Sequence, residues 1–216
     1  MMPVNHPPSE RLLAYATGAA DVPLRLLLET HLSFCPACAR EVGRLTAPGG
    51  TLLEAVPAEP VPTGLFERIW AEASQHEPPR PVEGVPLPPS VLAELPPAED
   101  WRWHAVPGSG SRTARLVSEA PGGCGLFLVH LQPGARFPRH AHRGGEEGLV
   151  LAGGVWDRGR FLEAGDWGSA PAGSSHELLA DAKEGCWALI REECEDVRLS
   201  GWRGVVQRLA QCHSTR

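Results

Sequence analysis

The chain has 216 residues, of which 42% are hydrophobic and 21% are charged, as in an ordinary globular protein. Its 20 basic and 26 acidic residues give a formal net charge of −6, which argues against a nucleic-acid-binding surface. Apolar stretches are short and broken by charges, and the first residues lack the basic and apolar segments of a secretory signal, so we expect no membrane contact. Six cysteines without an export signal favour thiols or metal ligands over disulfides and indicate a cytoplasmic protein.

Proline content divides the chain into two parts. Residues 57–100 hold eleven of the 22 prolines, which favours an extended, semi-rigid spacer rather than a core. Before this segment apolar residues recur at helical spacing, and after Trp101 short alternating runs between glycines are typical of an all-β unit. We therefore predict a two-domain α+β protein. The expected boundaries are 1–76 for the helical domain, 77–100 for the linker, 101–196 for the β domain, and 197–216 for a tail with a short helix at 202–209.

Three helices are predicted in the first fifty residues. Ser9 is the expected N-cap of the first helix, and Asp21 is the expected N-cap of the second. In the second helix the leucines of segment 24–32 share one face with His31, so this histidine should point inward. Pro36 suits the first turn of the third helix. An N–H in that turn has no acceptor within the helix, so a proline there loses no hydrogen bond.

A His-x3-Cys-x2-Cys pattern runs through the junction of the second and third helices. His31, Cys35 and Cys38 have the residue types and spacing of a zinc site, and the two thiolates would lie at a helix N-terminus that favours negative charge. A structural zinc site takes four ligands, and His6 is the expected fourth. The alternative is a buried histidine beside two small core cysteines. Other candidates for the fourth ligand are His76 and His104.

A further helix is predicted beyond two breaks in the chain. Pro48-Gly49-Gly50 and several later prolines should separate it from the first three helices. Thr63 is its expected N-cap. Such a helix either packs back on its own bundle or buries its aromatic residues against a partner. Its apolar stripe consists of Leu65, Phe66, Ile69 and Trp70.

The stretch His31-Leu-Ser-Phe-Cys35-Pro-Ala-Cys38, with His6 upstream and an amphipathic helix downstream, resembles the zinc-binding anti-sigma domain. The resemblance implies a structural zinc ion on these four residues, which would contribute on the order of 10 kcal/mol to the folding of a small unit. It also implies that three helices and a detached fourth clamp an extracytoplasmic-function sigma factor and cover its polymerase-binding surface.

A second group of metal-ligand residues lies near residue 140. His140 and His142 are two apart, so on a strand both point to one face. A turn at 143–145 then brings Glu146 to the start of the next strand, from which it can reach the same point. A turn at 171–173 would return the chain and present His176 as a fourth ligand.

These two stretches resemble the two motifs of the cupin barrel, a jelly-roll-like fold. By the family's spacing the acidic ligand is Glu146, and Glu147 would face the other side of its strand. Three imidazoles and one carboxylate suit Zn, Mn, Fe or Ni and leave coordination positions open. The alternative is a barrel that keeps its fold without a metal. Cys186, on a later strand, is either a thiolate that reacts with an oxidant or a small buried apolar residue.

The order of a zinc anti-sigma-like unit, a proline-rich linker and a complete cupin site is similar to the ChrR family of anti-sigma factors. The resemblance implies an anti-sigma factor that releases its sigma factor when the cupin metal senses singlet oxygen or an organic peroxide, as part of an oxidative stress response. We expect the signal to change how the barrel meets the linker and the helix at 64–75, and a zinc-loaded 1–76 fragment to bind without responding. The alternatives are a cupin dioxygenase-like enzyme and a zinc-binding adaptor for another partner.

Overall fold

The computed structural model describes residues 2–75, 81–118, 123–193 and 197–199. Its helices are α1 (Ser9–Ala16), α2 (Val22–Phe34), α3 (Pro36–Glu54), α4 (Leu65–Ala73), α5 (Pro89–Leu92) and the 3-10 turn η1 (Ala98–Asp100). Its strands are β1 (Trp103–Val106), β2 (Ser111–Ser118), β3 (Gly125–Leu131), β4 (Arg136–His142), β5 (Glu146–Asp157), β6 (Arg160–Glu163), β7 (Trp167–Ala170), β8 (Ser175–Ala180), β9 (Cys186–Glu192) and β10 (Val197–Leu199).

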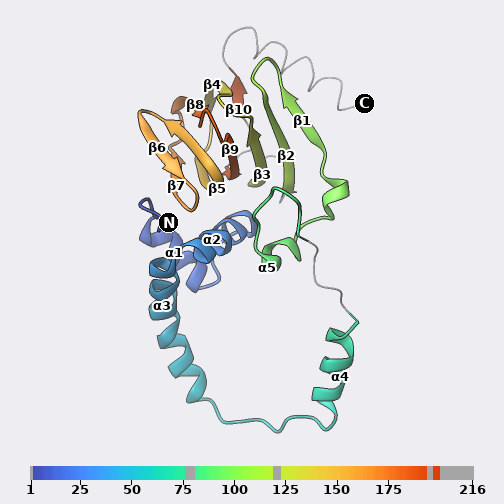
Figure 1. Ribbon diagram of the computed structural model, residues 1–216. Coiled ribbons are helices and arrows are strands. Elements are labelled where there is room, and N and C mark those ends of the chain that lie inside the picture. The colour runs from blue at the N-terminus through green and yellow to red at the C-terminus, as the bar shows by residue number, and fades with distance from the viewer. Residues whose placement is uncertain (1, 76–80, 119–122, 194–196, 200–216) are drawn as a thin grey trace.

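The strands form one strongly curled antiparallel sheet in the order β1-β2-β3-β9-β5-β8-β4-β10, with β6 and β7 also paired to β5. We call α1, α2 and the start of α3 the helical unit; it lies against one end of the curled sheet, whereas α4 stands apart from both (Figure 1). The predicted α+β organisation is therefore confirmed.

The long strand β5 joins the two halves of the sheet. Its first half pairs with β7 and β9, and its second half pairs with β6 and β8. Gly153 lies at the change, with a φ of +67° and no space for a side chain, because a Cβ there would lie 2.2 Å from the carbonyl oxygen of Gly185. This bend lets one strand present residues to the interior of the barrel along its whole length.

Of the three predicted helix N-caps, one agrees with the structure and two differ from it. Asp21 caps α2 as predicted, because its side chain accepts a hydrogen bond of 2.7 Å from the amide three residues on. Ser9 is the first residue of α1, and Pro8 holds the cap position without a side-chain hydrogen bond. The cap position of α4 belongs to Gly64 and not to Thr63. In both corrected cases the backbone sets the chain direction, through the restricted φ of proline or the left-handed φ of glycine.

Helix α3 is longer than the sequence predicts. The expected break at Pro48-Gly49-Gly50 is wrong, since α3 continues through these residues to Glu54. A proline removes one helix hydrogen bond, but this part of α3 is exposed and water can satisfy the freed carbonyl. The 19 residues of α3 therefore reach out from the sheet by roughly 1.5 Å per residue.

One hydrophobic cluster spans the helical unit and the sheet. Leu26, Leu27 and Leu28 of α2 are fully buried, and they share this cluster with Leu128 of β3 and Leu189 of β9. A three-helix unit of this size buries little apolar surface by itself, so much of its apolar surface is buried against the sheet. A second, smaller cluster lies inside the barrel and includes Val129, Leu131, Val150, Val155 and Cys186.

The second half of the proline-rich segment belongs to the core, so its prediction as a pure spacer is wrong. Val85, Leu87, Val91, Leu92 and Leu95 are buried in the cluster that the helical unit shares with the sheet. Proline restricts helices and central strands but does not prevent burial, and the apolar residues between these prolines pack as soon as a surface is available.

The β domain does not end at residue 196 as predicted, because β10 pairs with β4 and extends the sheet to Leu199. Its three residues lie opposite the segment from His140 to His142. The helix expected at 202–209 lies outside the described residues. In the described part of the chain, no helix has the length and apolarity needed to cross a membrane.

Candidate metal centres and an exposed helix

The structure brings His6, His31, Cys35 and Cys38 together, with one ligand atom from each within 4.8 Å of the others. His31 comes from the last turn of α2, and Cys35 and Cys38 come from the N-cap and first turn of α3. His6 comes from the segment before α1, and its Nδ1 lies 3.4 Å and 3.5 Å from the two sulfurs. Of the other candidates for the fourth ligand, His104 lies in β1 and His76 lies outside the described residues.

The chemistry of this group fits a zinc ion. The Nε2 of His31 is buried and has no hydrogen-bond partner, whereas the Nδ1 lies 3.0 Å from the carbonyl oxygen of Gly165. Burial lowers the pKa of His31 to about 4, which keeps the imidazole in the neutral form that ligates metals. Burial also raises the pKa of Cys38 to about 12, so a thiolate here needs a compensating cation. Two imidazoles and two sulfurs form a common tetrahedral zinc set.

A second group lies inside the barrel. His140 and His142 come from β4, Glu146 is the first residue of β5, and His176 comes from β8, where it pairs directly with His140. The Nε2 of His176 lies 3.0 Å from the Nε2 of His142 and 3.5 Å from a carboxylate oxygen of Glu146. Each of the four residues offers a ligand atom within 4.8 Å of the others. Glu147 faces away from this group, as predicted, and pairs with Arg191 at 3.0 Å.

Outer contacts fix the orientation of two of these imidazoles. The Nδ1 of His140 lies 2.9 Å from the carbonyl oxygen of Pro138, and the Nδ1 of His176 lies 2.8 Å from Asp157. Burial lowers the pKa of His140 to about 4. Burial alone would also lower the pKa of His176, but hydrogen bonds to Asp157 and Glu146 raise it to about 9. Sequence reasoning missed Asp157; its only signal is a position at the end of β5, beside the turn to β6.

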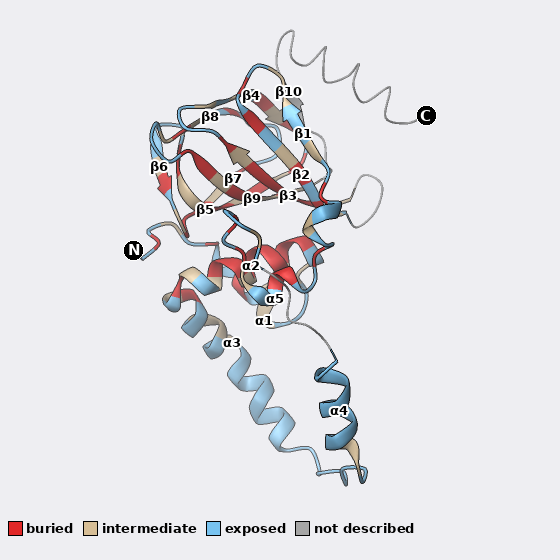
Figure 2. Cartoon of the chain, turned by 45° about the vertical axis from the view of Figure 1, so that its right-hand side comes forward, coloured by how far each residue is buried: buried red, intermediate tan, exposed pale blue. Residues whose placement is uncertain are grey.

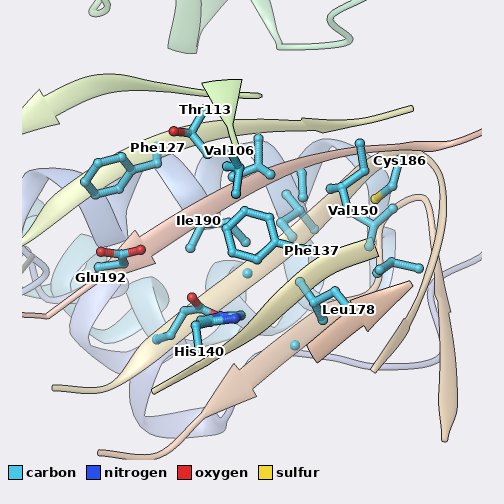
Figure 3. Close-up of a pocket in the computed structure, with 18 of the residues that line it drawn as sticks. Val106, Thr113, Phe127, Phe137, His140, Val150, Leu178, Cys186, Ile190 and Glu192 are labelled. Carbon is cyan, nitrogen blue, oxygen red and sulfur yellow. The ribbon is translucent and has the colours of Figure 1, made fainter. Parts of the chain in front are cut away.

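A cavity of about 910 Å³ adjoins the barrel group and is lined largely by apolar side chains (Figure 3). His140, Glu146 and His176 contribute to its wall, and so does Cys186. Figure 3 places Cys186 apart from His140. Burial raises the pKa of the Cys186 thiol to about 12, which favours the uncharged form. The arrangement can hold a divalent metal with room beside it for a small molecule.

Helix α4 presents an apolar face without a partner in the described chain. Phe66, Ile69 and Trp70 are 72%, 57% and 66% exposed, and the two aromatic rings stack at 6.2 Å. Leu65 is half-buried, and no residue of α4 is fully buried. Figure 2 shows α4 and the far end of α3 as exposed along their lengths. An exposed stripe of this size is typical of a protein-binding helix.

Comparisons with known proteins agree with this arrangement. Residues 95–193 match the model of a family described as the ChrR cupin-like domain. The chain is 33% identical to the anti-sigma-E factor ChrR of Cereibacter sphaeroides over 194 residues, which cover 87% of this chain and 89% of that protein. The chain belongs to the ChrR family.

The structural likeness extends to both parts of the ChrR architecture. The crystal structure of Rhodobacter sphaeroides SigE in complex with the anti-sigma ChrR matches with a TM-score of 0.66 and 28% identity, covering 89% of this chain and 100% of that chain. The polyketide cyclase RemF from Streptomyces resistomycificus matches with a TM-score of 0.42 and 19% identity, covering 51% of this chain and 89% of that chain. The second likeness is too distant to bear on activity.

Proposed function

We propose that this protein is an anti-sigma factor that sequesters an extracytoplasmic-function sigma factor through its helical unit and α4. The observation that carries the proposal is the exposed stripe of Phe66, Ile69 and Trp70 on a helix held away from the folded body. Its relative ChrR is an anti-sigma factor, and the structure that matches over most of this chain is a complex of ChrR with SigE. An apolar helix that the described chain leaves uncovered is suited to binding a protein partner.

The N-terminal group supports this function as a structural centre. Zinc on His6, His31, Cys35 and Cys38 would tie the segment before α1 to the junction of α2 and α3. This junction sets the direction in which α3 leaves the body and therefore where α4 is presented.

The barrel group supports a sensing role. A divalent metal (Zn, Mn, Fe or Ni) on His140, His142, Glu146 and His176 would supply an open coordination position to a small oxidant. The adjoining cavity gives such a molecule space beside the ligands. We propose that an oxidative signal, singlet oxygen or an organic peroxide, acts at this centre and lowers the affinity for the sigma factor. The thiol of Cys186 is a further candidate for the group that reacts with the oxidant.

The test is co-purification of the full-length chain from its native host, with the metal content measured per chain. A His31→Ala, Cys35→Ala double variant should lose N-terminal zinc and the sigma factor together. The matched variant His140→Ala should keep the sigma factor but fail to release it when peroxide is added. Retention of the sigma factor by the double variant after loss of zinc, or absence of any sigma factor from the unmodified preparation, would contradict the proposal.

The cavity gives a second candidate, a cupin-type metal-dependent oxidation of a small organic substrate. A volume of about 910 Å³ beside four ligand residues is large enough for such a substrate. Substrate turnover by the metal-loaded chain that is abolished in His140→Ala would favour this enzyme, whereas single-turnover oxidation of the protein itself would favour the sensor.

A further inference from the structure

The turn between β6 and β7 (residues 164–166) lies directly against the N-terminal metal group, although it belongs to the barrel. Figure 1 shows the N-terminal end of the chain beside β6 and β7. Gly165 has a φ of +92°, and a Cβ there would lie 2.7 Å from Pro3 and 3.0 Å from Phe34. A side chain at this position would therefore collide with the side chains of Pro3 and Phe34, so the backbone of the turn packs directly on them.

The turn determines which nitrogen of His31 faces the other ligands. The carbonyl oxygen of Gly165 lies 3.0 Å from the Nδ1 of His31, which therefore carries the proton and donates. The other nitrogen, Nε2, remains free as a ligand atom. Trp167, which follows the turn, packs edge-on against the same imidazole at 5.9 Å between ring centres. The outer contacts of His31 thus come from the barrel.

The turn also positions His6, the exposed member of the group. The Asp166 carboxylate accepts hydrogen bonds of 2.8 Å from the amides of Val4 and Asn5, the two residues before His6. The Trp167 amide donates to the carbonyl of Asn5 at 3.0 Å. Asp166 itself is only 4% exposed. His6 lies before α1, so these three bonds, together with one from Arg160 of β6 to the Asn5 side chain, hold the segment that carries it near the sulfurs.

The other side of the turn is bonded to the strand that carries Glu146. The Gly165 amide donates to the carbonyl of Val150 at 2.8 Å, and the Val150 amide donates to the carbonyl of Asp166 at 3.1 Å. Strand β7, which begins at Trp167, pairs with β5 so that Ala170 lies opposite Glu146. One short segment therefore connects the acidic ligand of the barrel group to two ligands of the N-terminal group.

We propose that this turn is the outer shell of the N-terminal metal site, with Asp166 as a positioning residue, and that it links the zinc affinity of that site to the conformation of the barrel. Because outer contacts of ligands tune metal affinity, a shift of β5 or β7 changes zinc binding, and zinc binding in turn stabilises the turn. This rests on the metal assignment within the proposed function and not on the sigma factor.

The test measures zinc affinity of the N-terminal site in the full chain. Cobalt(II) is bound first, and its thiolate charge-transfer absorption reports this site alone, because the barrel group contains no cysteine. Zinc then displaces the cobalt. Asp166→Ala should weaken zinc binding by roughly 10–100-fold, and Asp166→Asn, which keeps one acceptor oxygen, should weaken it less. The matched control is Glu163→Gln, an exposed carboxylate at the end of β6, which should leave the affinity unchanged.

A second measurement uses the unmodified protein and so does not depend on how the variants fold. Removal of zinc should speed hydrogen exchange at the Trp167 amide, which bonds to Asn5, while exchange in the interior of β9 stays slow. Zinc affinity within twofold of normal in both Asp166 variants, or unchanged exchange at Trp167, would overturn the linkage and leave the anti-sigma proposal intact. Absence of the thiolate band in the unmodified chain would overturn the metal assignment and the linkage together.

Discussion

At the scale of single residues, Asp157 accepts a hydrogen bond from the Nδ1 of His176, one of the four candidate metal ligands in the barrel. It is the last residue of β5 and is followed by Arg158, whose φ of +48° is the positive value expected in a tight turn between two strands. The carboxylate fixes the imidazole so that Nε2 points to His142 and Glu146. Outer carboxylates of this kind orient the ring and raise its basicity as a ligand.

Asp157→Asn should therefore weaken metal binding in the barrel by roughly 10–100-fold. The measurement is a competitive chelator titration of a chain whose N-terminal thiolates are already loaded with zinc. Asp181→Asn is the control, because that carboxylate is exposed and accepts hydrogen bonds only from main-chain amides of its own turn. Equal affinities for Asp157→Asn and the unmodified chain would refute the assigned role.

The sequence predicts which candidate ligand residues come together far better than it predicts the groups that hydrogen-bond to them. His31, Cys35 and Cys38 lie within eight residues, and helix geometry alone brings them together. The partner of His31 is the Gly165 carbonyl, 134 residues away, and a backbone oxygen leaves no trace in side-chain pattern. Asp157 lies 19 residues from His176, and Asp166 lies more than 160 residues from Val4 and Asn5, so these carboxylates could be found only after the strands were placed.

At the scale of secondary-structure elements, α4 is the helix that the described part of the chain leaves uncovered. Its apolar stripe agrees with the predicted one from Leu65 to Trp70, but the sequence alone could not decide whether the stripe packs on its own bundle. In the structure the stripe does not pack on the helical unit, because the uninterrupted 19 residues of α3 carry the chain away from the sheet before α4 begins.

Phe66→Ala and Trp70→Ala should each weaken sigma-factor binding by at least about tenfold, since large buried aromatics dominate protein interfaces. Neither change should alter the Tm, because both side chains are more than half exposed in the free protein. Calorimetric titration with the purified sigma factor and a thermal melt provide the two measurements. Trp156→Ala, at an exposed tryptophan of the barrel, is the control that should keep normal binding. Normal affinity in both α4 variants would place the binding surface elsewhere.

At the scale of the whole molecule, a buried arginine joins the helical unit to the barrel. Arg191 of β9 bonds to Asp21 at the start of α2, to Glu147 of β5 and to Glu193. Arg11 of α1 reaches the same Glu147 at 2.9 Å. The sequence signal for this docking is the nearly continuous apolar pattern of β3 and β5, which indicates strands buried on both faces. The alternating runs and the proline-rich segment alone predict two domains joined by a linker.

Arg191→Met should lower the free energy of unfolding by about 3 kcal/mol, because it removes the cation that Asp21, Glu147 and Glu193 share and leaves the buried Glu147 with Arg11 as its remaining ion-pair partner. Urea unfolding of the full chain measures this. Arg136→Met is the control: Arg136 and Glu177 form an exposed pair, both more than half accessible, so the loss should stay below about 1 kcal/mol. A similar loss in both variants would mean that the buried network contributes no more than a surface pair.

The cluster that α2 shares with the sheet also has a consequence for how the protein is made. The ribosome completes α2 about 130 residues before it reaches Trp167, an interval of roughly 7–27 s at ordinary rates of synthesis. Strands β2, β3 and β5 are synthesised during this interval and β9 only after it, so the cover of Leu26, Leu27 and Leu28 stays incomplete until then. The nascent helices therefore expose these leucines until the strands that cover them have been made. The N-terminal part is translated first but is among the last to reach its final packing.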